Sequence, residues 1–145
     1  MNDQAKLAVP TWFWIVGGLA LVWNLMGVFA FYLDMTMTEA ALAELSDAQQ
    51  ASYQNMPIWA KVAFGGAVIC GALGAVALLM RRSIAIVLFS ASLAAILVQM
   101  FNAFALQNGL EVFGPGSAVM PAMIVLIGML LLWFSNRATA RGWLQ

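Results

Sequence analysis

Residues 58–100 read IWAKVAFGGAVICGALGAVALLMRRSIAIVLFSASLAAILVQM, and this stretch decides the fold. Two long apolar runs flank the pair Arg81-Arg82, and Lys61 is the one charged residue inside them. A helix of roughly 20 apolar residues is long enough to cross about 30 Å of hydrocarbon. The stretch therefore predicts two membrane-spanning helices, and the short link between them makes them antiparallel neighbours.

The rest of the chain repeats this pattern. Of its 145 residues, 64% are hydrophobic and 8% are charged, whereas a soluble domain carries about 25% charged residues. Apolar stretches of spanning length occupy residues 11–33, 57–80, 83–106 and 117–134. We expect an all-α integral membrane four-helix bundle that forms a single domain over residues 1–145.

Charged residues predict how the bundle is oriented. The basic residues that precede span one, join spans two and three, or follow span four are Lys6, Arg81, Arg82, Arg137 and Arg141. The acidic residues of the opposite loops are Asp34, Glu39, Glu44, Asp47 and Glu111, which leaves Asp3 and Lys61 as exceptions. Loops rich in Lys and Arg stay in the cytoplasm. Both termini are therefore predicted to be cytoplasmic, and in a bacterium the acidic loops would face the periplasm.

Aromatic residues support the same orientation, because Trp and Tyr gather where a membrane meets water. The residues predicted at the inner interface are Trp12, Trp14, Trp133 and Trp143. Those predicted at the outer interface are Tyr32, Tyr53 and Trp59. Two independent signals thus give one topology.

The segment between the first two spans, residues 34–56, is predicted to be a short outer amphipathic segment. Thr38 is placed to cap one short helix, and Ser46 with Gln49 has the spacing of a capping box for another. Its thin apolar stripe consists of Leu42, Leu45 and Tyr53. We expect it to lie on the outer membrane surface or to cover the bundle, and an ordinary connecting loop is the alternative.

Small residues should hold the spans together, since lipid gives helices little hydrophobic reason to associate. In span two, Gly66, Cys70 and Gly74 recur every four residues. In the first span the corresponding stripe is Gly17, Ala20, Asn24 and Gly27; in the third it is Ser92, Ala95, Gln99 and Asn102. These stripes predict the faces that meet inside the bundle.

Polar side chains at membrane depth are the candidate functional positions. At 1.5 Å per residue, Asn24, Gln99 and Asn102 lie roughly 20, 24 and 28 Å from the inner end of their spans. All three therefore fall in the outer half of the membrane. The predicted pocket is lined by Trp23, Asn24, Asp34, Lys61, Gln99 and Asn102.

Two interpretations of these residues remain open. Amides that donate and accept hydrogen bonds, beside an indole face, suit a neutral polar solute such as a sugar. Alternatively, the amides bond to each other across helices and fix their register. Asp34 and Lys61 form either part of the pocket or a solvated ion pair at the interface.

Missing residues exclude several kinds of chemistry. There is no histidine and only one cysteine, Cys70, which excludes histidine-ligated haem or metal and paired-cysteine redox chemistry. No nucleophile has a plausible base within the spans. Zero net charge gives no reason to expect nucleic-acid binding. We therefore expect no enzymatic activity, no cofactor and no metal.

Four segments resemble a known group of proteins. They are residues 21–28 (LVWNLMGV), 47–50 (DAQQ), 111–116 (EVFGPG) and the tail 137–144. Together they are similar to an uncharacterised bacterial family of small four-span inner-membrane proteins, often automatically named "sugar transporter". The resemblance implies a bacterial inner-membrane protein and transfers no binding or catalytic residues.

These observations leave two functional hypotheses. One is a transporter or binder of a small neutral polar solute that works as a homo-oligomer, because four spans seldom enclose a whole pathway. The other is a non-enzymatic accessory subunit that stabilises a larger membrane complex, because the chain carries packing surfaces and no evident chemistry. Membrane lipid surrounds the protein in either case.

Overall fold

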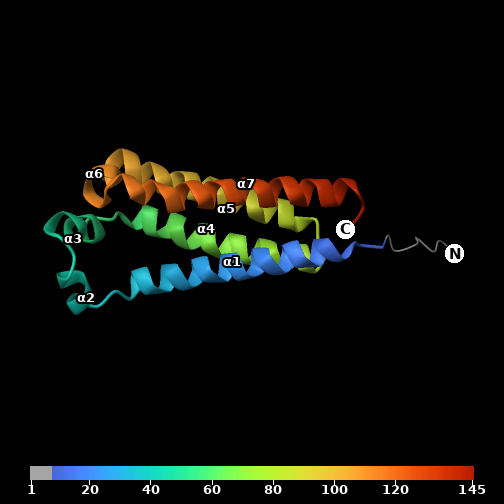
Figure 1. The fold of residues 1–145 in the computed structure, drawn as a ribbon, viewed down its shortest axis with the longest axis horizontal. Helices are drawn as coiled ribbons and strands as arrows, with labels where there is room; N and C mark the ends of the chain where they lie inside the picture. Colours follow the sequence, from blue (N-terminus) through green and yellow to red (C-terminus); the bar gives the residue numbers. More distant parts are fainter. Residues whose placement is uncertain (1–7) are drawn as a thin grey trace.

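The computed structural model describes residues 8–145 and is built from four long helices along a common axis (Figure 1). They are α1 (Thr11–Met35), α4 (Ile58–Leu79), α5 (Ile84–Met100) and α7 (Val119–Ala140). No strand occurs within the described residues. With their helical extensions, all four are long and apolar enough to cross a membrane. The predicted all-α four-helix membrane bundle is confirmed.

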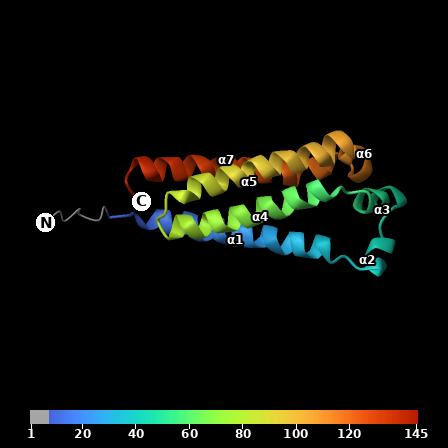
Figure 2. The same cartoon turned by 180° about the vertical axis from the view of Figure 1, so that it is seen from behind.

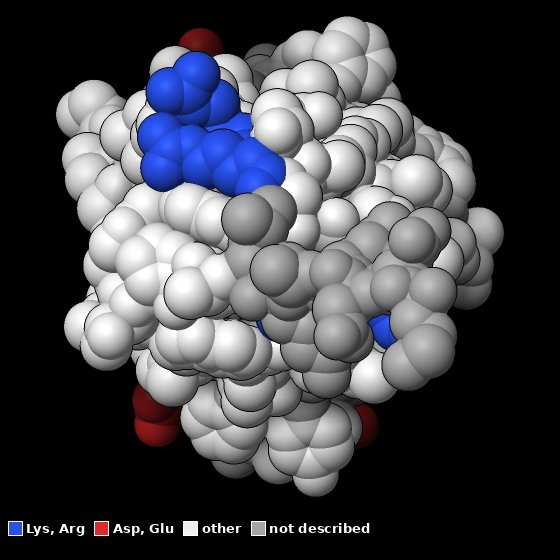
Figure 3. Space-filling model, turned by 90° about the vertical axis from the view of Figure 1, so that its right-hand side faces the viewer, with Lys and Arg blue, Asp and Glu red and all other residues white. Residues whose placement is uncertain are grey.

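The two ends of the bundle carry opposite charge. At the basic end, α1 begins and α7 ends beside the turn between α4 and α5 (Figures 1 and 2). Seen end-on, this end shows a patch of Lys and Arg side chains (Figure 3). The acidic end carries the short helices α2, α3 and α6 (Figure 1). The side of the membrane that each end faces stays a prediction, and Asp3 and Lys6 lie outside the described residues.

Helix α4 is the central packing element, with α1 on one side and α5 on the other. Its buried residues are Ala60, Gly65, Ala67, Gly71, Gly74, Ala75, Ala77 and Leu78. A Cβ at Gly74 would lie 2.9 Å from the Phe89 ring of α5, and one at Gly71 would overlap the Asn24 side chain of α1. The two glycines thus let both neighbours approach the α4 backbone closely, as expected in lipid.

The predicted row Gly66, Cys70 and Gly74 is only partly used in this packing. A Cβ at Gly66 would meet nothing within 4 Å, and Cys70 is half-buried. The close contacts fall on Gly71 and Gly74 because α4 packs against two helices at once. Residues four apart lie on one face of a helix, so a single row of them can contact only one neighbouring helix.

The basic half of the bundle is a closed apolar core. Phe13 of α1 and Leu78 of α4 are fully buried. The Phe13 ring lies 5.7 Å from Phe134 of α7 and 5.9 Å from Trp143. Trp143 is only 9% exposed, so its indole packs inside the basic end of the bundle, while its predicted depth at the inner interface stays a prediction. The tail after α7 folds back and places this indole in the core.

Backbone hydrogen bonds hold that tail in place. Arg81 lies in the left-handed region, with φ 58°. The backbone N–H of Gln145 donates to its carbonyl at 2.8 Å. The Arg81 Nε donates to the Trp143 carbonyl at 2.8 Å. The Ser83 amide donates to the Gln145 carbonyl, also at 2.8 Å. The tail thereby ties the end of α7 to the turn between α4 and α5.

The acidic end is covered by the segment that follows α1. Thr38 caps α2 (Glu39–Ala43), and Ser46 forms the predicted capping box with Gln49 at the start of α3 (Asp47–Gln54). Helix α3 packs on α6 (Gly109–Phe113). The segment therefore covers the bundle, which is one of the two arrangements expected for it.

Two details of the later helices differ from expectation. The third span reaches Leu106 as predicted, but its last turn, Phe101–Leu106, is a π-helix. The fourth begins with a 3₁₀ turn, Pro115–Ala118, and continues past residue 134 to Ala140. The apolar run ends at Phe134, but the helix continues because buried Ser135 and Ala138 still pack on the bundle.

The tight approach to α4 predicts a large difference between two of its glycines. Gly74→Val should destabilise the bundle by about 1–3 kcal/mol more than Gly66→Val, because only the former presses on a neighbouring side chain. Both changes put a β-branched residue in the same helix, so the propensity cost cancels. Unfolding of both variants in mixed micelles measures the difference. Equal losses would contradict the packing described.

Candidate functional site

Three cavities follow one another from the middle of the bundle to its acidic end. The central chamber, about 280 Å³, is lined by all four long helices. The amide cavity, about 330 Å³, lies beneath α3 and α6. The rim cavity, about 170 Å³, lies between the end of α1 and α3. The chamber and the amide cavity share Phe64, Gln99, Met100 and Ile124; the amide and rim cavities share Asp34, Tyr53 and Met56.

The central chamber presents an apolar surface. Its two short polar side chains are already engaged: Asn24 Nδ2 donates to the Ala20 carbonyl of its own helix at 2.8 Å. Ser92 Oγ donates to the Ala67 carbonyl on α4 at 2.7 Å. The wall between them consists largely of aliphatic and aromatic side chains, including Ile96 and Ile127.

The amide cavity differs because three polar side-chain atoms of its lining residues have no partners within residues 8–145. Gln99 Oε1, Asn102 Nδ2 and Gln107 Nε2 are buried, and none of them has a hydrogen-bond partner within residues 8–145. Asn102 is only 1% exposed. Leaving a buried polar group unpaired costs about 1–3 kcal/mol, and such groups are few in native proteins. The cavity is therefore lined by three amides that each keep one polar atom unpaired within the fold.

The π-helix changes the backbone register just before Gln107. Residues five apart in an α-helix point roughly 140° away from each other. In this turn the backbone N–H of Gln107 instead donates to the backbone carbonyl of Asn102 at 3.0 Å, and both residues line the amide cavity. Ser52 Oγ of α3 donates to the side-chain Oε1 of Gln107. A π-turn is frequently a feature of functional sites.

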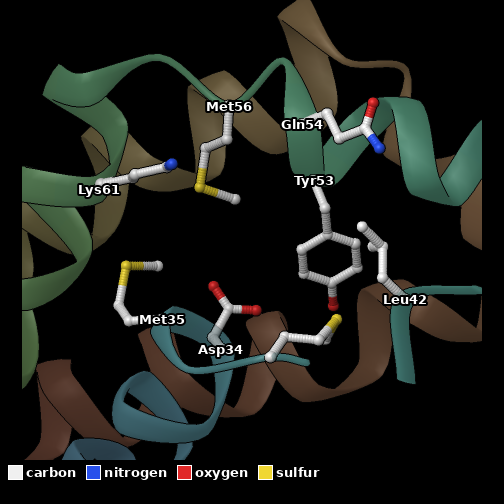
Figure 4. A pocket seen from close by; sticks show the side chains of 8 residues that line it. Asp34, Met35, Leu42, Tyr53, Gln54, Met56 and Lys61 are labelled. Atoms are coloured by element: carbon white, nitrogen blue, oxygen red, sulfur yellow. The ribbon is translucent and has the colours of Figure 1, made fainter. Parts of the chain in front are cut away.

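The rim cavity holds the charged residues of the predicted site. Figure 4 shows the Asp34 carboxylate and the Lys61 ammonium pointing into it from α1 and α4, apart from each other rather than in contact. Tyr53 reaches in from α3 with its hydroxyl on the Asp34 side (Figure 4). Burial raises the pKa of the Tyr53 phenol, and the negative charge of Asp34 raises it further.

The structure thus distributes the predicted site residues over three neighbouring cavities. Trp23, Asn24 and Gln99 line the central chamber. Gln99 and Asn102 meet in the amide cavity, which Asp34 also lines. Lys61 lines the rim cavity. Asn24 lies one chamber away from Asn102, so the three amides at similar depth do not form a single cluster.

Sequence reasoning missed the residues that complete the amide cavity, namely Ser52, Gln107 and, as a cavity residue, Tyr53. Gln107 stands one position beyond the apolar run that ends at Leu106, so it was excluded from the span. The available signal was a third amide, Gln107, following Gln99 and Asn102. Within residues 8–145, no three His, Cys, Asp or Glu side chains form a group suited to a metal.

Comparison with family models, curated proteins and solved structures gives no match for this chain. The resemblance noted in the sequence therefore stays a prediction.

The raised pKa of Tyr53 can be tested by titration. In a Tyr32→Phe background, Tyr53 is the remaining tyrosine, and its absorbance change should have a midpoint above the ordinary value of about 10. Asp34→Asn should lower that midpoint only part of the way, since burial is the larger cause. A folded pKa above the unfolded one means that stability is lost as pH rises beyond about 10. A midpoint unchanged by Asp34→Asn would refute the proximity of these groups.

Proposed function

We propose that this small membrane protein binds a neutral polar solute, or the neutral polar part of a larger molecule, in the amide cavity. The observation that carries the proposal is the set of three buried amide atoms without partners around one space. Amides offer both donors and acceptors without formal charge, which suits hydroxyl and carbonyl groups such as those of a sugar.

The alternative role of these amides, fixing helix register, has weaker support. An amide that fixes register would donate or accept across a helix interface. The hydrogen bond between α4 and α5 within the apolar part of the bundle is instead made by Ser92. Gln99 Oε1 and Asn102 Nδ2 make no such bond within residues 8–145. A role in fixing helix register therefore does not account for these two amides.

The site lies near the acidic end, beneath α3 and α6, and the bundle is closed on its basic side. Phe13, Leu78 and Phe134 fill the basic half. Transport demands more than binding, because it also requires a path through this half. That path would form either by separation of the core or between copies in a homo-oligomer. The charge distribution supports an acidic end that faces the periplasm of a bacterial inner membrane.

Substitution of the free amides tests the proposal. Binding of glycerol, erythritol and glucose to the purified protein in nanodiscs should be weakened by Asn102→Leu, about 5- to 100-fold if one buried hydrogen bond is lost. Gln107→Leu should act in the same direction. The matched control is Asn136→Leu, because Asn136 is an exposed amide on α7 that bonds only to the Leu132 carbonyl.

Stability measurements separate a binding role from a structural one. Asn102→Leu removes a buried group without a partner and has similar volume, so folding stability should stay the same or rise. Unchanged polyol binding together with a clear loss of stability would overturn the proposal. That result would favour the accessory-subunit hypothesis instead.

A further inference from the structure

We infer that the bound molecule is an amphiphile, with a neutral hydrogen-bonding head in the amide cavity and one apolar chain in the central chamber. The chain would enter sideways from the bilayer, between α1 and α7. This inference rests on the proposed function for the head and adds the chemical class of the ligand.

The first argument is the adjacency of two unlike compartments. The central chamber and the amide cavity share four lining residues, so they lie next to each other. Gln99 stands between them and lines both, with its Oε1 buried and unpaired within residues 8–145. A molecule that extended from one into the other would meet an apolar wall at one end and the amide residues at the other.

The second argument is the chemistry of the chamber wall. Asn24 Nδ2 and Ser92 Oγ already donate to backbone carbonyls, and the rest of the wall is largely aliphatic and aromatic. A hydroxyl moved there from water would lose its hydrogen bonds, at a cost of several kcal/mol in a fully apolar setting. A hydrocarbon chain loses no such bonds. The chamber therefore suits the apolar part of a ligand.

The third argument is the position of the chamber's mouth. Residues that line the chamber and are also largely exposed lie on two helices: Met26 (59%) on α1 and Met120 (56%) on α7. These helices touch through Trp12 and Phe134 at the basic end, with ring centroids 5.6 Å apart. They diverge toward the acidic end (Figure 1). Because both belong to apolar spans, the mouth opens onto acyl chains rather than water.

The charges near the head site favour a neutral group. Asp34 lines the amide cavity and would repel an anionic head. Lys61 faces the same rim as Asp34, so the two opposite charges give a cationic head no clear advantage. The free amides carry no charge. Either orientation of a side-chain amide is uncharged, since turning it over only puts a donor where an acceptor was. The site is therefore neutral in both cases.

The two parts of the ligand contribute differently. In a bilayer, a chain that enters the chamber leaves one apolar environment for another, so it gains little free energy. Selectivity then comes from hydrogen bonds to the head, and the chain must only fit. Changes to the amides should therefore alter affinity, whereas filling the chamber should exclude the ligand sterically.

The experiment uses the full protein in nanodiscs and a monodecanoylglycerol that carries a photoactivatable diazirine in the middle of its chain. Labelling should fall on the chamber side of α7, at Ile124 and Ile127. The outward residues Leu126 and Leu130 of the same helix, both about half exposed, report ordinary lipid contact. Asn102→Leu should reduce chamber labelling at least fivefold and leave outward labelling unchanged.

A second variant tests the chamber itself. Gly128 lines it, and a Cβ there would lie 3.2 Å from Leu93 Cδ1, so Gly128→Leu should abolish chamber labelling. The control is Gly18→Leu, because a Cβ at Gly18 meets nothing within 4 Å. Glycerol binding should survive in the Gly128→Leu variant, since the amide cavity is left in place.

The outcomes separate this inference from the proposed function. Suppose that glycerol binds in an Asn102-dependent manner but the diazirine labels only the outward face of α7. The inference that the ligand is an amphiphile is then wrong, and the proposed polar site is supported. If Asn102→Leu changes neither glycerol binding nor labelling, both are wrong. Chamber labelling that depends on Asn102 and Gly128 would support both together.

Discussion

The close approach of three helices at α4 is the constraint on which the rest of this structure depends. Gly71 and Gly74 allow α1 and α5 to pack against the α4 backbone from two sides. In lipid this contact, rather than the hydrophobic effect, holds the helices together. The Asn24 side chain lies against Gly71, and Ser92 bonds to Ala67 one turn away. The same contact therefore positions the wall of the central chamber.

Helix α7 is held differently, and the cavities follow from that difference. It packs along α5 and meets α1 mainly through aromatic side chains at the basic end. The tail from Trp143 to Gln145 ties this end to the turn at Arg81. Toward the acidic end no comparable contact joins α7 to α1 among the residues described. The bundle is consequently closed at one end and hollow at the other, with α3 and α6 above the hollow part.

The features that local sequence determines were predictable, and those that depend on side-chain partners were not. Span lengths follow from runs of apolar residues, and the caps at Thr38 and Ser46 follow from spacing within one turn. The π-turn at the end of α5 has no such local signature, because one backbone register replaces another without a change in hydrophobicity. Gln107 was missed because it stands one position beyond the apolar run that ends at Leu106. The burial of Trp143 was not predictable, because it depends on a tail that folds back onto the core.

The unpaired amides differ from other polar groups of the same bundle, which do have hydrogen-bond partners. Asn24, Ser92, Ser135 and Asn136 each donate to a backbone carbonyl. Such bonds are the ordinary way in which a polar side chain is accommodated in an apolar helix. Asn102 is as deeply buried as Ser92 and Ser135, and yet its Nδ2 has no such bond within residues 8–145. It lies in the π-turn, where the backbone register differs from that of an α-helix. The unpaired amide atoms of Gln99, Asn102 and Gln107 thus belong to side chains that line one cavity, and this arrangement is what the proposed polar site rests on.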